Sequence, residues 1–385
     1  MDEQKLRIAV IGIRNMPPSS GSAGEDKFAS ELYPRLVERG HEMTAYLRVY
    51  QKPFPAMRKY KGVKLVYLKT TRRSGFDTLL HSMKATFHII FSNTVDVVHI
   101  HNGGNSIWAI FLRLAGMRVF VSQDGVDWNR EKWPLYAKLY LYASSLVTAF
   151  VPNDVIIDNV FSKKFFEDRF KKTFSFIPYG SEVPEIDDDD DEILRTLGVK
   201  PGEYFLFVGR FIPDKGLHYL IPAFEQVETD KKLILVGGSP NPSSYEKEIQ
   251  ETSDSRIVFP GYVYGDDVVR LMKDAYSYIQ PSDVEGLSPV ILMVMGLGTP
   301  LICSDIEENK FIVRTDAGTF TRGNIDSLSE QLKFALNNRK FLRERATRGK
   351  EMVYQRFNWE KVTDEHVALF SGQSKHVGDD ADLSG

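Results

Sequence analysis

The sequence predicts an α/β protein built from two doubly wound domains, each a parallel sheet with helices on both faces. Strand-like and helix-like segments alternate along the chain. The strand-like segments are almost continuously apolar, as in sheets that are buried on both faces. At 385 residues, the chain is also too long for one ordinary core and suits two domains of about 150–200 residues.

The first half contains two kinds of segment in alternation. Apolar periodicity predicts helices over Asp26–Arg39 and Asn105–Ala115, and Gly40 follows the first of them as a C-terminal cap. The strands, rich in β-branched and aromatic residues, are predicted at 6–12 (LRIAVIG), 41–47 (HEMTAYL), 95–101 (VDVVHIH), 117–122 (MRVFVS) and 173–178 (TFSFIP).

The second half repeats the plan. Strands are predicted at 204–209 (YFLFVG), 232–237 (KLILVG), 256–261 (RIVFPG), 276–281 (YSYIQP) and 300–304 (PLICS). Helices are predicted at 217–227, 266–275, 288–296 and 325–338.

An acidic connector marks the domain boundary. We place an N-terminal domain at 1–180, a linker at 181–192 and a C-terminal domain at 193–358. The run Asp187–Glu192 contains Asp-x-Asp, which could bind a metal, but a linker or the acidic first turn of a helix is the simpler interpretation. The polar residues 371–385 are expected to be disordered.

Composition indicates a cytoplasmic protein. Cys303 is the single cysteine, so disulfides cannot hold the fold together. The N-terminus lacks the pattern of a signal peptide. No run of 18 uncharged apolar residues occurs, and we interpret the closest candidate, Trp133–Val151, as a buried helix.

Charge is distributed unevenly. Residues 1–180 contain 26 Lys and Arg against 16 Asp and Glu, whereas residues 181–385 contain 23 against 36. Lys52–Arg73 contains eight basic residues and no acidic one. Such a segment suits an anionic membrane surface or a phosphate-bearing lipid, and a solvated basic loop is the alternative. Nucleic acid is not predicted, because no recognition motif accompanies the charge.

Two loops after predicted strands favour an anionic ligand, since ligands of doubly wound sheets bind beyond the carboxyl ends of the strands. In 208–216 (VGRFIPDKG), Gly209 allows a sharp turn, and Arg210 and Lys215 suit a diphosphate, although they could be incidental surface charges.

The second loop precedes an apolar helix. Gly286 and Leu287 leave backbone N–H groups free for an anion near the helix start at Ser288. Glu285 would repel a phosphate, so binding of sugar hydroxyls suits it better; its alternative role is that of an acidic residue favoured by the helix dipole.

Three further features belong to the first half. Gly24 lies in a glycine-bearing loop that is not G-x-G-x-x-G, so it is either an anion site or a plain loop. We take His99 and His101 to face opposite sides of their strand, so that they cannot share a metal and at most His101 reaches the cleft. Asp124 and Asp127 could contact a polar substrate or be turn residues.

In their order, these segments resemble the retaining glycosyltransferases of family 4, which have the GT-B fold. The resemblance extends from Arg7 to about Phe370 and is closest to rhamnosyltransferase-like polysaccharide enzymes, through GIRNMP, LVERGHEMTAY, DGVDWNREKW and FIPYG. It implies a nucleoside-diphosphate-sugar donor held by the C-terminal domain, a glycan or lipid-linked acceptor held by the N-terminal domain, and neither a metal nor another cofactor.

The resemblance also implies residue roles. Arg210 and Lys215 match the diphosphate pair, and Glu285 matches the first glutamate of the family's E-x7-E motif, which contacts the donor sugar. Tyr262 and Val263 match a loop that lines the base pocket, and Gly24 matches the glycine loop near the β-phosphate. A final helix, here Trp359–Phe370, returns to the N-terminal domain.

Two positions depart from the family. Met293 replaces the second glutamate, which grips the ribose, and Asp124 stands where a histidine is more usual. The leading hypothesis is a retaining, hexosyltransferase-type enzyme, placed in the cytoplasm or peripherally on the inner face of the cell membrane. The alternatives are a non-catalytic nucleotide-sugar-binding or assembly protein and a nucleotide-sugar epimerase of the same fold.

Overall fold

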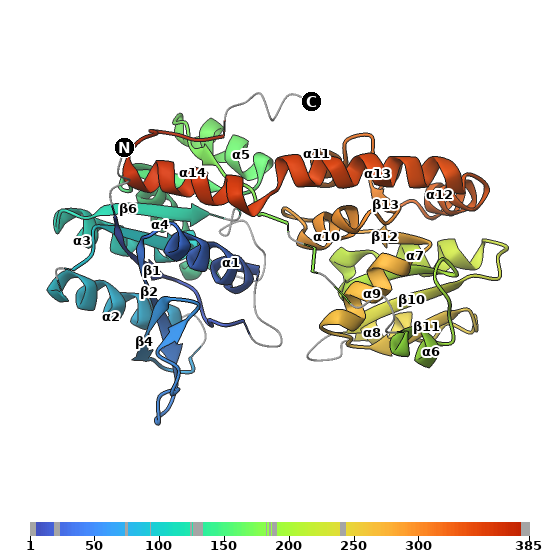
Figure 1. Ribbon diagram of the computed structural model, residues 1–385, viewed down its shortest axis with the longest axis horizontal. Coiled ribbons are helices and arrows are strands. Elements are labelled where there is room, and N and C mark those ends of the chain that lie inside the picture. Colours follow the sequence, from blue (N-terminus) through green and yellow to red (C-terminus); the bar gives the residue numbers. More distant parts are fainter. Residues whose placement is uncertain are drawn as a thin grey trace. The chain divides into compact units, whose positions relative to one another are not determined.

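The computed structural model describes residues 5–18, 24–73, 76–92, 94–123, 125, 134–181, 183–184, 186, 191–238 and 244–378. The chain forms two compact units (Figure 1). Unit 1 comprises Met1–Gly180 with Trp359–Gly385, and unit 2 comprises Ser181–Asn358.

Unit 1 is built on a sheet in which every pairing is parallel except that between β3 and β4. Its strands, in spatial order, are β3 (Lys59–Tyr60), β4 (Val63–Lys69), β2 (Glu42–Val49), β1 (Arg7–Ile11), β5 (Val97–His101), β6 (Arg118–Gln123), β7 (Asp154–Ile157) and β8 (Ser175–Phe176).

Alternation along β1 divides the core of unit 1 into two layers. Ile8 and Val10 pack with α1 (Gly24–Glu38) and α14 (Trp359–Ser371) on one face. Ala9 and Ile11 pack with α2 (Phe76–Ser92) and α3 (Ala109–Leu114) on the other. The short helix η1 (Gly103–Trp108), α4 (Leu135–Phe150) and α5 (Val160–Phe170) complete the unit.

The C-terminal helix returns to the N-terminal unit, as predicted. The Trp359 ring lies 5.5 Å from that of Phe28, between centroids. At the surface, the Arg39 guanidinium lies 2.5 Å from Glu360 and 2.9 Å from Asp364. Burial of aromatic rings supplies most of the stabilisation, because exposed ion pairs contribute at most about 1 kcal/mol.

The structure corrects three expectations in unit 1. The basic segment is no plain loop, since it contains the β3–β4 hairpin at the edge of the sheet. The tail is ordered beyond α14, because the Val377 N–H donates to Ser175 Oγ at 3.0 Å; residues 379–385 lie outside the described part. Helix α4, predicted to be buried, exposes Leu135 and Leu139 to solvent.

Unit 2 has a smaller, wholly parallel sheet. In spatial order it contains β11 (Ile257–Gly261), β10 (Lys232–Gly238), β9 (Tyr204–Arg210), β12 (Ser277–Gln280), β13 (Leu301–Ser304) and β14 (Gly318–Phe320). The predicted strands of this half are confirmed, and β14 is an addition.

Helices cover the sheet of unit 2. Helices α7 (Leu217–Glu225) and α12 (Ile325–Asn337) share one core with Phe205 and Phe207 of β9. Helix α10 (Pro289–Leu297) contacts α9 (Asp266–Asp274) and α13 (Arg339–Arg356). Helices α6 (Glu192–Leu197), α8 (Ser244–Ile249) and α11 (Glu307–Val313) complete the unit. Helix α6 begins at Glu192, which is the last residue of the predicted linker.

Candidate functional site

The strand order of unit 2 marks one place for a ligand. From β9 the chain winds outward through β10 and β11, then returns to place β12 on the other side of β9. The loops after β9 and β12 therefore diverge at neighbouring carboxyl ends, which is where doubly wound folds bind ligands. Arg210 and Lys215 follow β9, and Glu285 follows β12.

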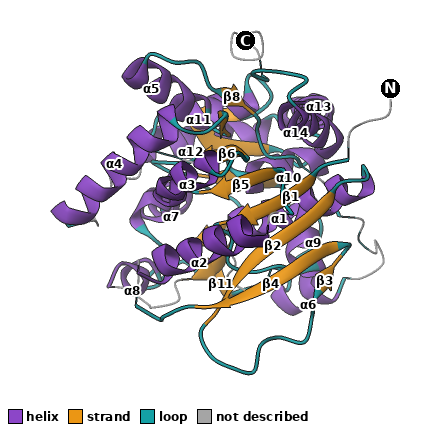
Figure 2. Ribbon diagram, turned by 90° about the vertical axis from the view of Figure 1, so that its left-hand side faces the viewer, coloured by secondary structure: helices purple, strands orange, loops and turns teal. Residues whose placement is uncertain are grey.

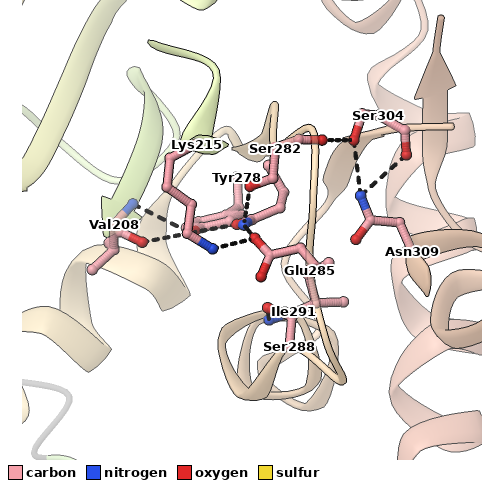
Figure 3. A network of polar contacts seen from close by, with 10 residues as sticks. Val208, Lys215, Tyr278, Ser282, Glu285, Ser288, Ile291, Ser304 and Asn309 are labelled. Carbon is pink, nitrogen blue, oxygen red and sulfur yellow. Dashed lines mark hydrogen bonds and ion pairs between the residues drawn. The ribbon is translucent and has the colours of Figure 1, made fainter. Parts of the chain in front are cut away.

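Lys215 and Glu285 form the centre of the site (Figure 3). Lys215 Nζ lies 2.5 Å from Glu285 Oε1, and Gln280 Nε2 donates to the same oxygen at 2.5 Å. The two charged side chains are 19% and 9% exposed. A nearly buried carboxylate with two donors on one oxygen is held in a single orientation. The structure thus brings together two of the predicted site residues as an ion pair.

Gln280 is itself oriented by a buried tyrosine. The Tyr278 hydroxyl accepts from the Val208 N–H at 3.2 Å and lies 3.1 Å from Gln280 Oε1. Burial raises the pKa of Tyr278, so the hydroxyl stays protonated. Residues 278 and 280 are two apart on β12 and share a face. Strand β12 therefore positions Glu285 through Gln280.

A second set of contacts holds the loop after β12. Ser304 Oγ of β13 donates to the Ser282 carbonyl at 2.5 Å, and Asn309 Nδ2 of α11 donates to Ser304 Oγ at 3.0 Å. The Asp283 N–H donates to the Asp214 carbonyl at 2.9 Å, which ties this loop to the one that carries Lys215. This backbone hydrogen bond between the two loops supports the ion pair.

Helix α10 begins where the sequence predicts. Ser288 is its N-cap and accepts from the Ile291 N–H at 3.4 Å, with Pro289 as the first helical residue. Gly286 is exposed, and an added Cβ there would meet no atom within 4 Å. Within the described part of the chain, the N–H groups of Gly286 and Leu287 have no acceptor. An anion could occupy this open space at the positive end of the helix.

Two glycines let the backbone approach closely at the site. Gly216, at φ +70°, carries the chain into α7, and an added Cβ would lie 2.0 Å from the Pro281 carbonyl oxygen. Gly237, at φ +133°, lies opposite Gly209 in the β9–β10 register, where a Cβ would lie 1.8 Å from the Gly209 carbonyl oxygen. Side chains are excluded from both positions.

Arg210 and Tyr262 lie on the β10–β11 side of the site. Arg210 is exposed and pairs with Gly238 in the strand register, and Tyr262 lies next to Gly238. Partial burial raises the pKa of Tyr262, Tyr264 and Glu246 raise it further, and the Arg210 charge lowers it. The rings of Tyr262 and Tyr264 are parallel, with centroids 5.8 Å apart. Val263 lies between them in the chain.

Other predicted residues lie elsewhere. Gly24 is the first residue of α1 in unit 1, with open space around it. Asp124 and Asp127 lie outside the described residues. Met293 is half-buried on α10. Among the described residues, no group of three or more His, Cys, Asp or Glu side chains could hold a metal ion.

The prediction for His99 and His101 was wrong. Residues two apart on a strand share a face, and both rings contact the buried Tyr33 hydroxyl, His99 Nδ1 at 2.9 Å and His101 Nε2 by a shorter contact. Burial lowers the pKa of His101 to about 3. These histidines are neutral core residues with the same hydroxyl as partner.

Gln280 and Tyr278 were absent from the predicted site. The signal was nevertheless present, because two polar side chains with one residue between them end an otherwise apolar strand. Their importance depends on β12 lying beside β9, which the order of strands along the chain does not reveal.

Comparison with known proteins identifies a family for the part of the chain that carries this site. Residues 189–352 match the family model described as glycosyl transferases group 1. The chain carries a group 1 glycosyltransferase domain. Its two doubly wound units have the GT-B fold, which the sequence resemblance predicted.

Similarity to individual proteins extends over both units. An uncharacterised glycosyltransferase of Methanocaldococcus jannaschii is 24% identical over 89% of this chain and 93% of its own length. An Escherichia coli galactosyltransferase named for UDP-Gal and α-D-GlcNAc-diphosphoundecaprenol is 24% identical over 63% of this chain and 66% of its own length. The structure of Anabaena HepE in complex with UDP superposes with a TM-score of 0.77, at 16% identity, covering 95% of this chain and 100% of HepE.

Within the described parts of the GT-B chain, no helix is long and apolar enough to cross a membrane.

Proposed function

We propose that this protein transfers a hexose, with retention of configuration, from a nucleoside-diphosphate sugar to a glycan or lipid-linked acceptor. The Lys215–Glu285 pair beside the N-terminus of α10 carries the proposal. Lys215 and the free N–H groups at the start of α10 would bind the diphosphate. The Glu285 carboxylate beside them would bind the sugar. The solved HepE–UDP complex and the E. coli enzyme named for a diphosphate-linked lipid support the choice of donor and acceptor classes.

The residues of unit 2 suggest how the reaction proceeds. The bond between the anomeric carbon and the diphosphate breaks, and negative charge develops on the leaving diphosphate. Arg210, Lys215 and the Gly286 and Leu287 N–H groups stabilise that charge. The acceptor hydroxyl attacks from the same face and passes its proton to a diphosphate oxygen. Glu285 binds the hydroxyls of the transferred sugar, and no metal is needed because the cations are side chains.

Replacing Arg210 by alanine tests the donor site. A charge-assisted hydrogen bond contributes about 1.5–3 kcal/mol, so Arg210→Ala should weaken nucleoside diphosphate binding about 10–100-fold. The measurement is calorimetric titration with UDP, GDP and dTDP and their sugars. Arg343→Ala, an exposed arginine on α13, is the matched control. Wild-type protein that binds none of these donors would contradict the proposal.

Met293 motivates the second candidate, a non-catalytic nucleotide-sugar-binding or assembly protein. A thioether sulfur is a much weaker hydrogen-bond acceptor than the carboxylate that would grip the ribose. If the site still uses that position, Met293→Glu should tighten UDP binding by about tenfold or more, because it adds a charge-assisted acceptor. The same titration measures it, with Met352→Glu on α13 as control. Tight binding of nucleotide sugars without transfer to any of a broad set of acceptors would favour the non-catalytic candidate.

A further inference from the structure

One face of unit 1 exposes aromatic side chains on the helices α2 and α3. Phe91 is 82% exposed and Leu114 is 81% exposed. They flank a cluster in which the Phe87 ring lies 6.3 Å from Phe91 and 6.2 Å from Phe111, between centroids. The Trp108 ring of η1 lies 5.8 Å from Phe111 of α3 and 6.4 Å from Phe87 of α2, so it bridges the two helices. Soluble surfaces rarely gather aromatic side chains in this way unless they bind something.

Helix α4 continues this surface. Leu135, Leu139, Leu146 and Phe150 are all exposed, and their spacing places them along one side of the helix. Helix α4 contacts α3, and α3 contacts α2. Figure 2 shows the three helices as a layer beside the strands of unit 1. We call these exposed side chains of α2, α3 and α4 the apolar surface.

The surroundings of the apolar surface are strongly basic. Residues 52–123 contain eleven Lys and Arg against two acidic residues, Asp77 and Asp96. Both acidic residues are paired, Asp77 with Arg48 at 3.0 Å and Asp96 with Arg7 at 2.7 Å. The eight basic residues of 52–73 are all exposed. The charge that remains uncompensated in this part of unit 1 is therefore positive.

The β3–β4 hairpin holds basic side chains where they repel one another. Lys59 and Lys64 lie directly opposite in the antiparallel register, an arrangement that destabilises a hairpin. Lys84, three residues before Phe87 on α2, donates to the Lys69 carbonyl at 2.7 Å, so the basic segment adjoins the apolar surface. An anion at the hairpin would relieve the repulsion.

We propose that the apolar surface and the Lys52–Arg73 segment together dock this protein onto an anionic lipid bilayer. Aromatic and leucine side chains would enter the interface while lysines and arginines meet lipid phosphates. A second copy of the chain fits less well, because a two-fold contact would bring the same positive charges together. The proposal concerns unit 1 alone and goes beyond sugar transfer, although a lipid-linked acceptor would give the docking a purpose.

Sedimentation with vesicles tests the proposal, using the full chain and no sugar donor. Binding to vesicles of phosphatidylcholine with phosphatidylglycerol should exceed binding to phosphatidylcholine alone, and should fall as salt rises. Equal binding to both vesicle types would overturn the proposal. So would self-association in lipid-free buffer that is lost with Phe91→Ser and Leu114→Ser together, since that result would assign the surface to a second copy.

Two variants separate binding from folding. Lys64→Glu places opposite charges across the hairpin, so it should stabilise β3–β4 while weakening vesicle binding about tenfold or more, since each basic residue near the surface contributes about fivefold. Phe91→Ser with Leu114→Ser should weaken binding about tenfold, because both side chains are exposed and their loss leaves the core intact. Unchanged vesicle binding in both would overturn the proposal.

The matched controls lie in unit 2. Phe334→Ser with Tyr354→Ser removes exposed aromatic side chains, and Lys340→Glu reverses an exposed lysine. Both controls should bind vesicles as the wild type does. The vesicle assay contains no nucleotide, so its result does not depend on the nucleotide titration. The membrane proposal and the sugar-transfer proposal are therefore tested independently.

Discussion

Glu285→Gln is expected to reduce sugar transfer about 100–1,000-fold while leaving nucleoside diphosphate binding unchanged or tighter. The carboxylate accepts from Lys215 and Gln280 on one oxygen and is 9% exposed. An amide keeps the shape but removes the charge that positions Lys215. It also removes a negative charge that repels the diphosphate, and this gain offsets the weaker positioning of Lys215 for the nucleotide. The effect should therefore appear in turnover and not in affinity.

Turnover and UDP affinity are measured on the same preparation. Glu344→Gln, an exposed carboxylate on α13, is the matched control and should change neither quantity. A variant that loses UDP binding but transfers sugar normally once saturated would contradict the role of Glu285, because the residue would then serve only to hold the nucleotide.

Mild acid is expected to unfold unit 1 while unit 2 remains folded. Burial lowers the pKa of His81 and His101 to about 3 and that of His366 to about 4, and it lowers the pKa of His99 well below its usual range. The unfolded histidines titrate near 6.5. Between these values the unfolded chain binds protons that the folded chain excludes, so stability falls as the pH drops below about 6.5.

The expected slope is large. Each such histidine contributes about 1.4 kcal/mol per pH unit, so four give a limiting value of roughly 5 kcal/mol per unit. Asp154, whose pKa burial raises, works in the opposite direction but is one group against four. Carboxylates with a lowered pKa, such as Asp96 beside Arg7, reduce the stability of the folded unit when they are protonated, which happens at more acidic pH. Between pH 6.5 and about 5.5 the histidines therefore dominate the slope.

Tryptophan fluorescence reports this transition selectively, because all four tryptophans belong to unit 1. Urea titrations from pH 7.5 to 4.5 give the slope, and His366→Gln should reduce it by about a quarter whatever its effect on stability at pH 7.5. Nucleotide binding follows unit 2, which contains only His218 of the eight histidines. A urea midpoint, followed by tryptophan fluorescence, that does not change with pH would contradict the prediction that the buried histidines are neutral.

The local pattern of apolar residues predicted the strands that are covered by helices on both faces of the sheet. Strands such as β9 and β10 are continuous apolar runs, and α10 carries its Ser288 cap and Pro289 in sequence. The short strands β7 and β14 escaped prediction because few residues leave little periodicity. The β3–β4 hairpin was not predicted because lysines occupy its exposed positions. Such a pattern indicates a loop unless the pairing of β4 with β2 is known.

The sequence by itself determined the two α/β halves, the loops at the strand ends and the charged residues that those loops carry, because each depends on neighbours in the chain. Only the tertiary structure decided that Lys215 and Glu285 pair, and that Gln280 joins them. Strand order places β12 beside β9, and no local pattern encodes strand order. The same is true of the apolar surface, whose aromatic side chains come from separate helices and meet only when the helices pack on one sheet.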